Sequence, residues 1–240
     1  MKITIFLLTV VLYFNRVSTH SVKEKVEESL KLVEEEINKT KVKIEDEIRD
    51  INRYRKSLQF NFNSKIVPLQ EDNVKTIRCF NNVLLEKIIV LVNNSKIHGK
   101  NPTKCYEMSQ IAMRTININS YASLNKCSKE ATKFVEQVQT NIDEIISTGE
   151  TLTTELNRIF LDCHSRLPKI KLHCANKKIK KLEVRIKNFE SISDSIKTTG
   201  DSASDQGYLH GISCYHDVVT EAREHALKVL VDAENCINNY

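Results

Sequence analysis

Turn-forming residues are so scarce in this chain that it can form little besides helix. Its 240 residues include only five glycines and three prolines. Long segments without either residue favour helix, because proline removes a backbone donor and glycine costs conformational entropy. The sequence therefore predicts an all-α fold, a disulfide-bridged antiparallel helical bundle preceded by a long amphipathic, coiled-coil-like helix.

The most regular helical signal covers residues 22–58. Apolar residues recur there every seven positions, at Leu30, Ile37, Ile44, Ile51 and Leu58. A seven-residue apolar repeat is typical of a coiled-coil seam, which must be covered by a partner helix. The stripe fits two arrangements: a long helix that packs against its own domain, or self-association through 22–58.

Six helices are expected, separated where turn-forming and polar residues gather. After the first helix, the expected helices cover 73–94, 103–146, 151–163, 169–197 and 208–238. The expected breaks are 61–72, 96–102, 147–150, the turn at Pro168 and 198–207. The break at 61–72 is the expected domain boundary. It separates a signal peptide (1–19) and a long amphipathic helix (20–66) from a cysteine-bearing bundle (73–240).

The start of the chain has the pattern of a secretory signal peptide. Lys2 precedes an apolar run at 3–14 and small residues at 17–19. This run is shorter than the roughly 20 residues that span a bilayer. Two acceptor sequences for N-glycosylation, at Asn38 and Asn93, fit the same compartment. We expect a secreted, extracellular glycoprotein without a transmembrane anchor.

Seven cysteines follow the signal peptide: Cys79, Cys105, Cys127, Cys163, Cys174, Cys214 and Cys236. Outside the cell they predict a disulfide framework, and their odd number leaves at least one thiol over. Cys105 and Cys127 lie 22 residues apart on one expected helix, about 33 Å in a straight helix and too far for a bridge. The same holds for Cys214 and Cys236. Cys174–Cys236 is the first pair we expect, and the rest of the connectivity stays open.

Sequence signatures of catalysis are missing. The chain has no His-Glu-x-x-His, Gly-x-Ser-x-Gly, phosphate-binding loop or dinucleotide fingerprint. Cys163-His164 and His173-Cys174 surround the Pro168 turn and could hold zinc, but two disulfide cysteines with exposed histidines fit an extracellular protein better. A second, weaker cluster comprises His216, Glu221 and His225. We therefore expect no enzyme activity, no metal site and no cofactor.

Basic residues are concentrated on both sides of residue 180. Four of them share one helix face opposite the apolar side: Lys177, Lys178, Lys181 and Arg185. Such a face could bind an anionic glycan, phospholipid or bacterial surface, although a solvated charged face is the simpler interpretation. No aromatic residues interleave for base stacking, so nucleic acid is not an expected partner. The formal net charge is +5, and removal of Lys2 and Arg16 with the signal peptide leaves about +3, which is too mild to imply a polyanionic partner for the whole chain.

The order of cysteines over 105–236 resembles that of the TsetseEP-like family of secreted insect proteins. Cys105-Tyr106 opens the matching region, Cys174 soon follows Cys163, and Cys236 closes it. The chain departs from the pattern in having one cysteine near 163 where two are expected, with Cys79 upstream of the match. The resemblance implies a protein of an insect gut or secretion, in some members linked to immune challenge. It carries no catalytic residues over.

These observations together predict a secreted, non-enzymatic binding or structural protein with an unknown extracellular partner and a role in defence. The alternative is a helical carrier that encloses an apolar small molecule. A third hypothesis is a structural protein that oligomerises through 22–58.

Overall fold

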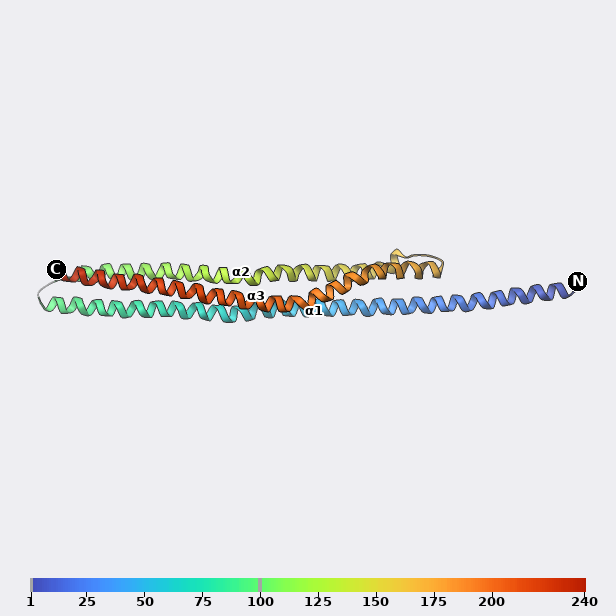
Figure 1. Ribbon diagram of the computed structural model, residues 1–240, viewed down its shortest axis with the longest axis horizontal. Coiled ribbons are helices and arrows are strands. Elements are labelled where there is room, and N and C mark those ends of the chain that lie inside the picture. Colours follow the sequence, from blue (N-terminus) through green and yellow to red (C-terminus); the bar gives the residue numbers. More distant parts are fainter. Residues whose placement is uncertain (1, 99–100) are drawn as a thin grey trace. The chain divides into compact units, whose positions relative to one another are not determined.

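The computed structural model describes the backbone of residues 2–98 and 101–240, and the side chains of 23–98 and 101–240. The described residues form three helices, α1 (Lys2–Ile97), α2 (Thr103–Asp162) and α3 (Pro168–Asn238) (Figure 1). The predicted disulfide-bridged, antiparallel all-α fold is confirmed. The predicted signal peptide at 1–19 lies outside the residues whose side chains are described.

Three of the predicted breaks, at 61–72, 147–150 and 198–207, are wrong. Each lies inside one continuous helix, so the six predicted helices are three. Pro68 lies inside α1 on its exposed side. A proline inside a helix costs about 3 kcal/mol, and buried residues on both sides, including Ile66 and Ile77, offset that cost by packing. As predicted, α1 ends and α2 begins near 96–102, at Ile97 and Thr103, and Pro168 is the first residue of α3.

Glycines inside α2 and α3 mark places where helices approach closely. A Cβ at Gly207 would lie 2.7 Å from the carbonyl oxygen of Ala131, and one at Gly149 would lie 2.8 Å from Cδ1 of Ile48. Neither distance leaves room for a methyl group. Gly149 and Gly207, which suggested turns, therefore serve helix–helix packing.

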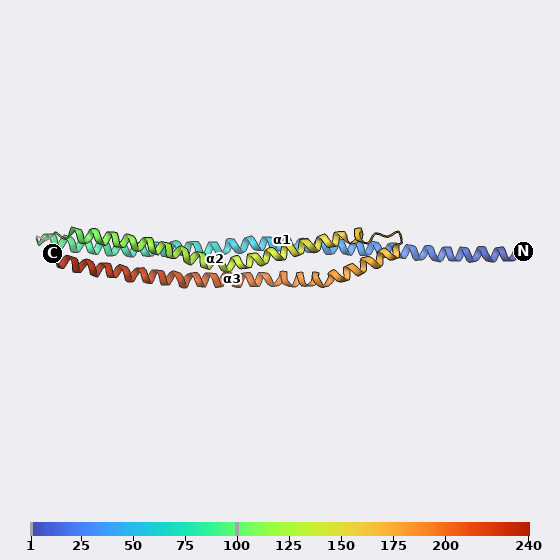
Figure 2. The ribbon, with the colours of Figure 1, turned by 90° about the horizontal axis from the view of Figure 1, so that it is seen from above.

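The chain divides into two compact units. Unit 1 combines Met1–Tyr54 with Asn141–Lys197, and unit 2 combines Arg55–Thr140 with Thr198–Tyr240. Within unit 2, segments of all three helices lie side by side, with α2 antiparallel to α1 and α3 (Figures 1 and 2). Whether residues 20–66 and 73–240 act as separate domains stays a prediction.

Buried residues of unit 1 recur every seven positions on all three helices. They are Ile37, Ile44 and Ile51 on α1, Ile145, Leu152 and Ile159 on α2, and Leu182, Phe189 and Ile196 on α3. A seven-residue repeat is the pattern of coiled-coil packing. The stripe predicted over 22–58 is thus buried inside the chain from Ile37 to Leu58, whereas Leu30 is half-buried, and self-association through the stripe has no support.

Buried residues of unit 2 follow a different period, of eleven positions. On α1 they include Ile66, Ile77 and Ile88, and on α3 Ser204, Tyr215, Ala226 and Ile237. An eleven-residue repeat corresponds to 3.67 residues per turn, so its apolar stripe drifts relative to a seven-residue stripe. The predicted breaks at 61–72 and 198–207 lie in segments whose buried residues, among them Ile66 and Ser204, follow this second period. The helices continue while their buried face moves to other positions.

Polar side chains between α1 and α2 repeat at the same interval in unit 2. Gln139 donates to Gln59 at 2.6 Å, Ser128 to Gln70 at 2.6 Å and Asn81 to Asn117 at 2.8 Å. Successive bonds are eleven residues apart on each helix. Since a slip of one turn would break all three bonds, they fix the register of α1 against α2.

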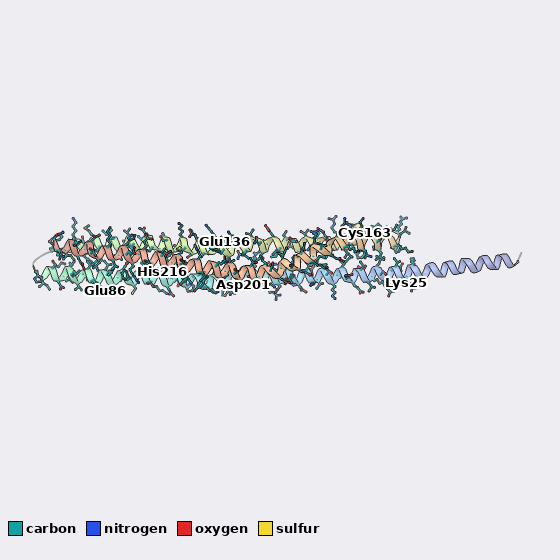
Figure 3. The ribbon with its side chains drawn as sticks, viewed as in Figure 1. Lys25, Glu86, Glu136, Cys163, Asp201 and His216 are labelled. Carbon is teal, nitrogen blue, oxygen red and sulfur yellow. A yellow bond between two sulfur atoms is a disulfide. The ribbon has the colours of Figure 1, made fainter. Side chains whose placement is uncertain are left out.

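Six cysteines form three disulfides, which confirms the predicted framework. Cys105–Cys236 and Cys127–Cys214 join α2 to α3 in unit 2, and Cys163–Cys174 joins the end of α2 to the start of α3 in unit 1; Figure 3 labels Cys163. The expected pair Cys174–Cys236 is wrong. Cys174 is bonded to Cys163 instead, and Cys236 to Cys105. Cys79 is free and exposed.

Candidate functional site

The basic face predicted from the sequence lies on α3 in unit 1, opposite two acidic residues of α2. Lys178 Nζ donates to Asp162 Oδ2 at 2.6 Å, and Arg185 Nη1 donates to Glu155 Oε2 at 2.5 Å. The hydrogen bond from Lys178 holds the pKa of the Asp162 carboxyl below its usual range. Two of the four predicted cations are therefore neutralised by ion pairs.

Between the two ion pairs lies a groove of about 460 Å³. Ile159 and Leu182, both buried, line it together with Arg158 and Lys181. Arg158, Lys181 and the nearby Lys177 are exposed. Among the described residues no ion pair involves Lys177, Lys181 or Arg158. Lys177 and Lys181 of the basic face are thus available to a ligand, and Arg158 joins them from α2, where its charge also acts on Asp162.

The two cysteines of the zinc site considered at the Pro168 turn form a disulfide. Cys163 and Cys174 are bonded to each other, so neither offers a thiolate to a metal. His164 and His173 are exposed beside the bridge. Within 23–98 and 101–240, no group of three or more His, Cys, Asp or Glu side chains could hold a metal ion.

The second histidine cluster is divided. Glu221 and His225 of α3 line a small hollow of about 100 Å³ in unit 2, together with Ser120 of α2. His216 does not line it; Figure 3 labels this residue on α3. The hollow has no further acidic or histidine side chain in its lining.

Both predicted glycosylation acceptors are accessible. Asn38 and Asn93 are exposed on α1, so a glycan at either position would meet no steric barrier from the described residues. Among the residues with described side chains, no helix includes a segment long and apolar enough to cross a membrane.

A second groove, of about 320 Å³, was not predicted from the sequence. It lies between α1 and α2 in unit 2. Buried Ile77, Ser120 and Leu124 line it, and Arg78 of α1 and Arg114 of α2 are its charged residues. The remaining lining side chains are Val74, Asn117, Ile118 and Tyr121.

Both charged residues that line this second groove are cationic. Among the described ion pairs, none involves Arg78 or Arg114. The flanking sequence explains this, because residues 73–85 and 108–129 contain no aspartate or glutamate. That absence of acidic residues is the sequence signal that could have pointed to the groove. That the two arginines line the same groove, however, depends on the register of α1 against α2.

Comparisons of the chain with protein-family models, with curated proteins and with solved structures found no match.

Proposed function

We propose that this protein is an exported, non-enzymatic binding protein that attaches to anionic glycans through the basic face of unit 1. The observation that carries the proposal is the groove between α2 and α3, where Arg158 and Lys181 lie beside two ion pairs and Lys177 is exposed on the same helix as Lys181. The bridge Cys163–Cys174 and the two ion pairs hold α2 beside α3, so the backbone positions that carry Arg158 and Lys181 keep a defined spacing. Sulfated or carboxylated sugars carry the complementary charge.

Export is supported by the cysteines and the acceptor asparagines. Three disulfides are stable in an oxidising compartment, and Asn38 and Asn93 are exposed. The signal-peptide pattern at 1–19 agrees with them. Expression of the full chain in insect cells, followed by deglycosylation of the medium fraction, tests this part. Retention inside the cells would contradict it.

The setting proposed for the protein is an insect gut or secretion, with a role in defence. It rests on the cysteine order shared with the TsetseEP-like family over 105–236. Binding to the surface glycans of microbes or of the gut lining is an activity that a disulfide-bridged helical scaffold can perform amid proteases, because the bridges oppose local unfolding.

Binding to immobilised heparin, a sulfated glycan, tests the proposed site. We expect Arg158→Gln/Lys181→Gln to elute at clearly lower salt than the unchanged protein, because fewer counterions are released on binding. Lys25→Gln/Lys31→Gln is the matched control, since it removes two exposed cations from α1 of the same unit. Equal elution shifts for both variants would show only a general charge effect and would overturn the site.

The alternative function is a carrier of an apolar small molecule. The two larger hollows described above are surface grooves, whereas a carrier that encloses its ligand requires a lined cavity. This alternative is supported only by the groove of unit 2, whose lining combines apolar and cationic side chains.

A further inference from the structure

The groove of unit 2 combines the two features that recognise a molecule with an acidic head and an apolar chain. Arg78 and Arg114 offer positive charge, and Val74, Ile77 and Leu124 offer apolar surface. We propose that this groove binds a single-chain fatty acid, with its carboxylate at the arginines and its hydrocarbon chain against the apolar lining. The site shares no residue with the basic face of unit 1 and does not depend on glycan binding.

The arginines suit a carboxylate in number and in position. One comes from α1 and the other from α2, so the head group would be held from both helices. A guanidinium presents its donors in a planar fork that matches a carboxylate, and such charge-assisted bonds are about twice as strong as neutral ones. Since neither arginine has an acidic partner among the described residues, a ligand carboxylate would have no internal competitor.

The apolar part of the groove suits a short hydrocarbon chain. Ile77 and Leu124 are buried, whereas Ile118 is 61% and Tyr121 52% exposed. A bound chain would cover these exposed apolar surfaces and gain about 25 cal/mol for each Å² removed from water. At about 30 Å³ for each water-sized group, the volume of about 320 Å³ holds roughly ten such groups. That number corresponds to a medium-chain acid.

The walls of the groove are held in place before any ligand binds. Asn117, which lines the groove, accepts a hydrogen bond from Asn81 at 2.8 Å. Asn81 is 1% exposed, and its Oδ1 has no hydrogen-bond partner among the described residues. This bond is one of the three that fix α1 against α2, so the fold sets the spacing of the backbone at Arg78 and Arg114, whose side chains are exposed.

Isothermal titration calorimetry, in which decanoate is added to the disulfide-intact protein collected from the culture medium, tests the proposal. We expect saturable binding of one decanoate, with about tenfold weaker affinity in Arg78→Gln or Arg114→Gln and a larger loss in the double variant. Lys129→Gln is the matched control, because it removes an exposed cation from α2 outside the groove lining. It should bind as the unchanged protein does.

Two further measurements distinguish the contribution of the carboxylate to binding from that of the hydrocarbon chain. 1-Decanol, which lacks the charge, and acetate, which lacks the chain, should both bind more weakly than decanoate. Ile118→Glu places a carboxylate at an exposed position of the lining, where it should repel the head group without loss of folding. Circular dichroism confirms the fold of each variant.

Three results would overturn the proposal: no saturable decanoate binding by the unchanged protein, equal affinity in the double arginine variant, or an equal loss in Lys129→Gln. None of them bears on heparin binding, whose variants lie in unit 1. Failure of this site and failure of the proposed function are therefore distinguishable.

Discussion

The hydroxyl of Tyr215 on α3 lies 2.7 Å from Oγ of Ser128 on α2, and this contact belongs to a network that joins all three helices of unit 2. Ser128 also donates to Gln70 of α1 at 2.6 Å, and Gln70 donates to Asn125 at 2.6 Å. Tyr215 is 1% exposed, and burial raises the pKa of its hydroxyl. A buried polar network that is fully bonded specifies one arrangement of the helices.

Tyr215→Phe should lower the free energy of unfolding by about 1 kcal/mol, because it removes one hydrogen bond and keeps the ring. Urea unfolding followed by circular dichroism measures the change. Tyr240→Phe, at an exposed position, is the control and should change nothing. An equal result for both variants would mean that the Tyr215–Ser128 bond adds no stability.

The close approach at Gly207 predicts an unusual result for a helix. Alanine normally stabilises a helix relative to glycine by about 1 kcal/mol. At Gly207, however, the new methyl group would meet the backbone oxygen of Ala131 at 2.7 Å, which cannot move alone. At Gly211 it would meet Cδ1 of Ile66, the end of a side chain that can rotate.

Thermal unfolding should therefore show a larger decrease in Tm for Gly207→Ala than for Gly211→Ala. The second variant is the control for the change in helix propensity, which the two share. A higher Tm for Gly207→Ala than for the unchanged protein would show that the helices can separate at this point at little cost.

The three disulfides should contribute unequally to stability. In the chain-entropy account, the bridge Cys105–Cys236, with a sequence separation of 131, stabilises by about 5 kcal/mol. Cys163–Cys174, with a separation of 11, stabilises by about 3 kcal/mol. Replacing each pair by serine and measuring urea unfolding without reductant tests the order. The reverse order would show that local packing at the short bridge outweighs chain entropy.

Cys79 should be the one cysteine that reacts with iodoacetamide in the native, non-reduced protein. The other six cysteines are bridged, whereas Cys79 is free and exposed on α1. Mass spectrometry should find a single adduct, and Cys79→Ser should abolish it. More than one adduct would mean that at least one bridge is absent from the protein in solution.

The ion pair of Asp50 with Lys197 in unit 1 predicts a defined pH dependence. The hydrogen bond from Lys197 lowers the pKa of Asp50, and the same bond raises the pKa of Lys197. Asp50 contributes to the free energy of unfolding above its unfolded pKa of about 3.9. This contribution is lost as the pH falls through the lower pKa of the folded state. Lys197 contributes to the free energy of unfolding below its unfolded pKa of about 10.4. This contribution is lost as the pH rises through the higher pKa of the folded state.

Asp50→Asn should therefore be less stable than the unchanged protein between these limits, and the difference should shrink at both extremes. Urea unfolding at a series of pH values measures it. Asp217→Asn, at an exposed position with no ion pair among those described, is the control and should show no such window. A difference that persists at low pH would assign the effect to something other than this ion pair.

Much of the fold could be predicted from single residues and their spacing. The seven-residue repeat of Ile37, Ile44 and Ile51 marked the buried face of α1, and those residues are buried. The length of the helices also showed correctly that Cys105 cannot pair with Cys127. Such predictions succeed because they depend on distances along one helix, which the sequence contains directly.

Only the tertiary structure decided the continuity of the helices, the pairing of the cysteines and the second groove. Gly149, Gly200, Gly207 and Pro68 suggested turns, yet the space that packed neighbours leave determines whether a glycine bends a chain or admits a second helix. Cys174 pairs with Cys163 and not with Cys236, since residues 198–207 are helical and form no hairpin loop. Arg78 and Arg114 share a groove through the register that Asn81 and Asn117 help to set. A sequence gives each helix its apolar face, but what lies opposite that face is decided by packing.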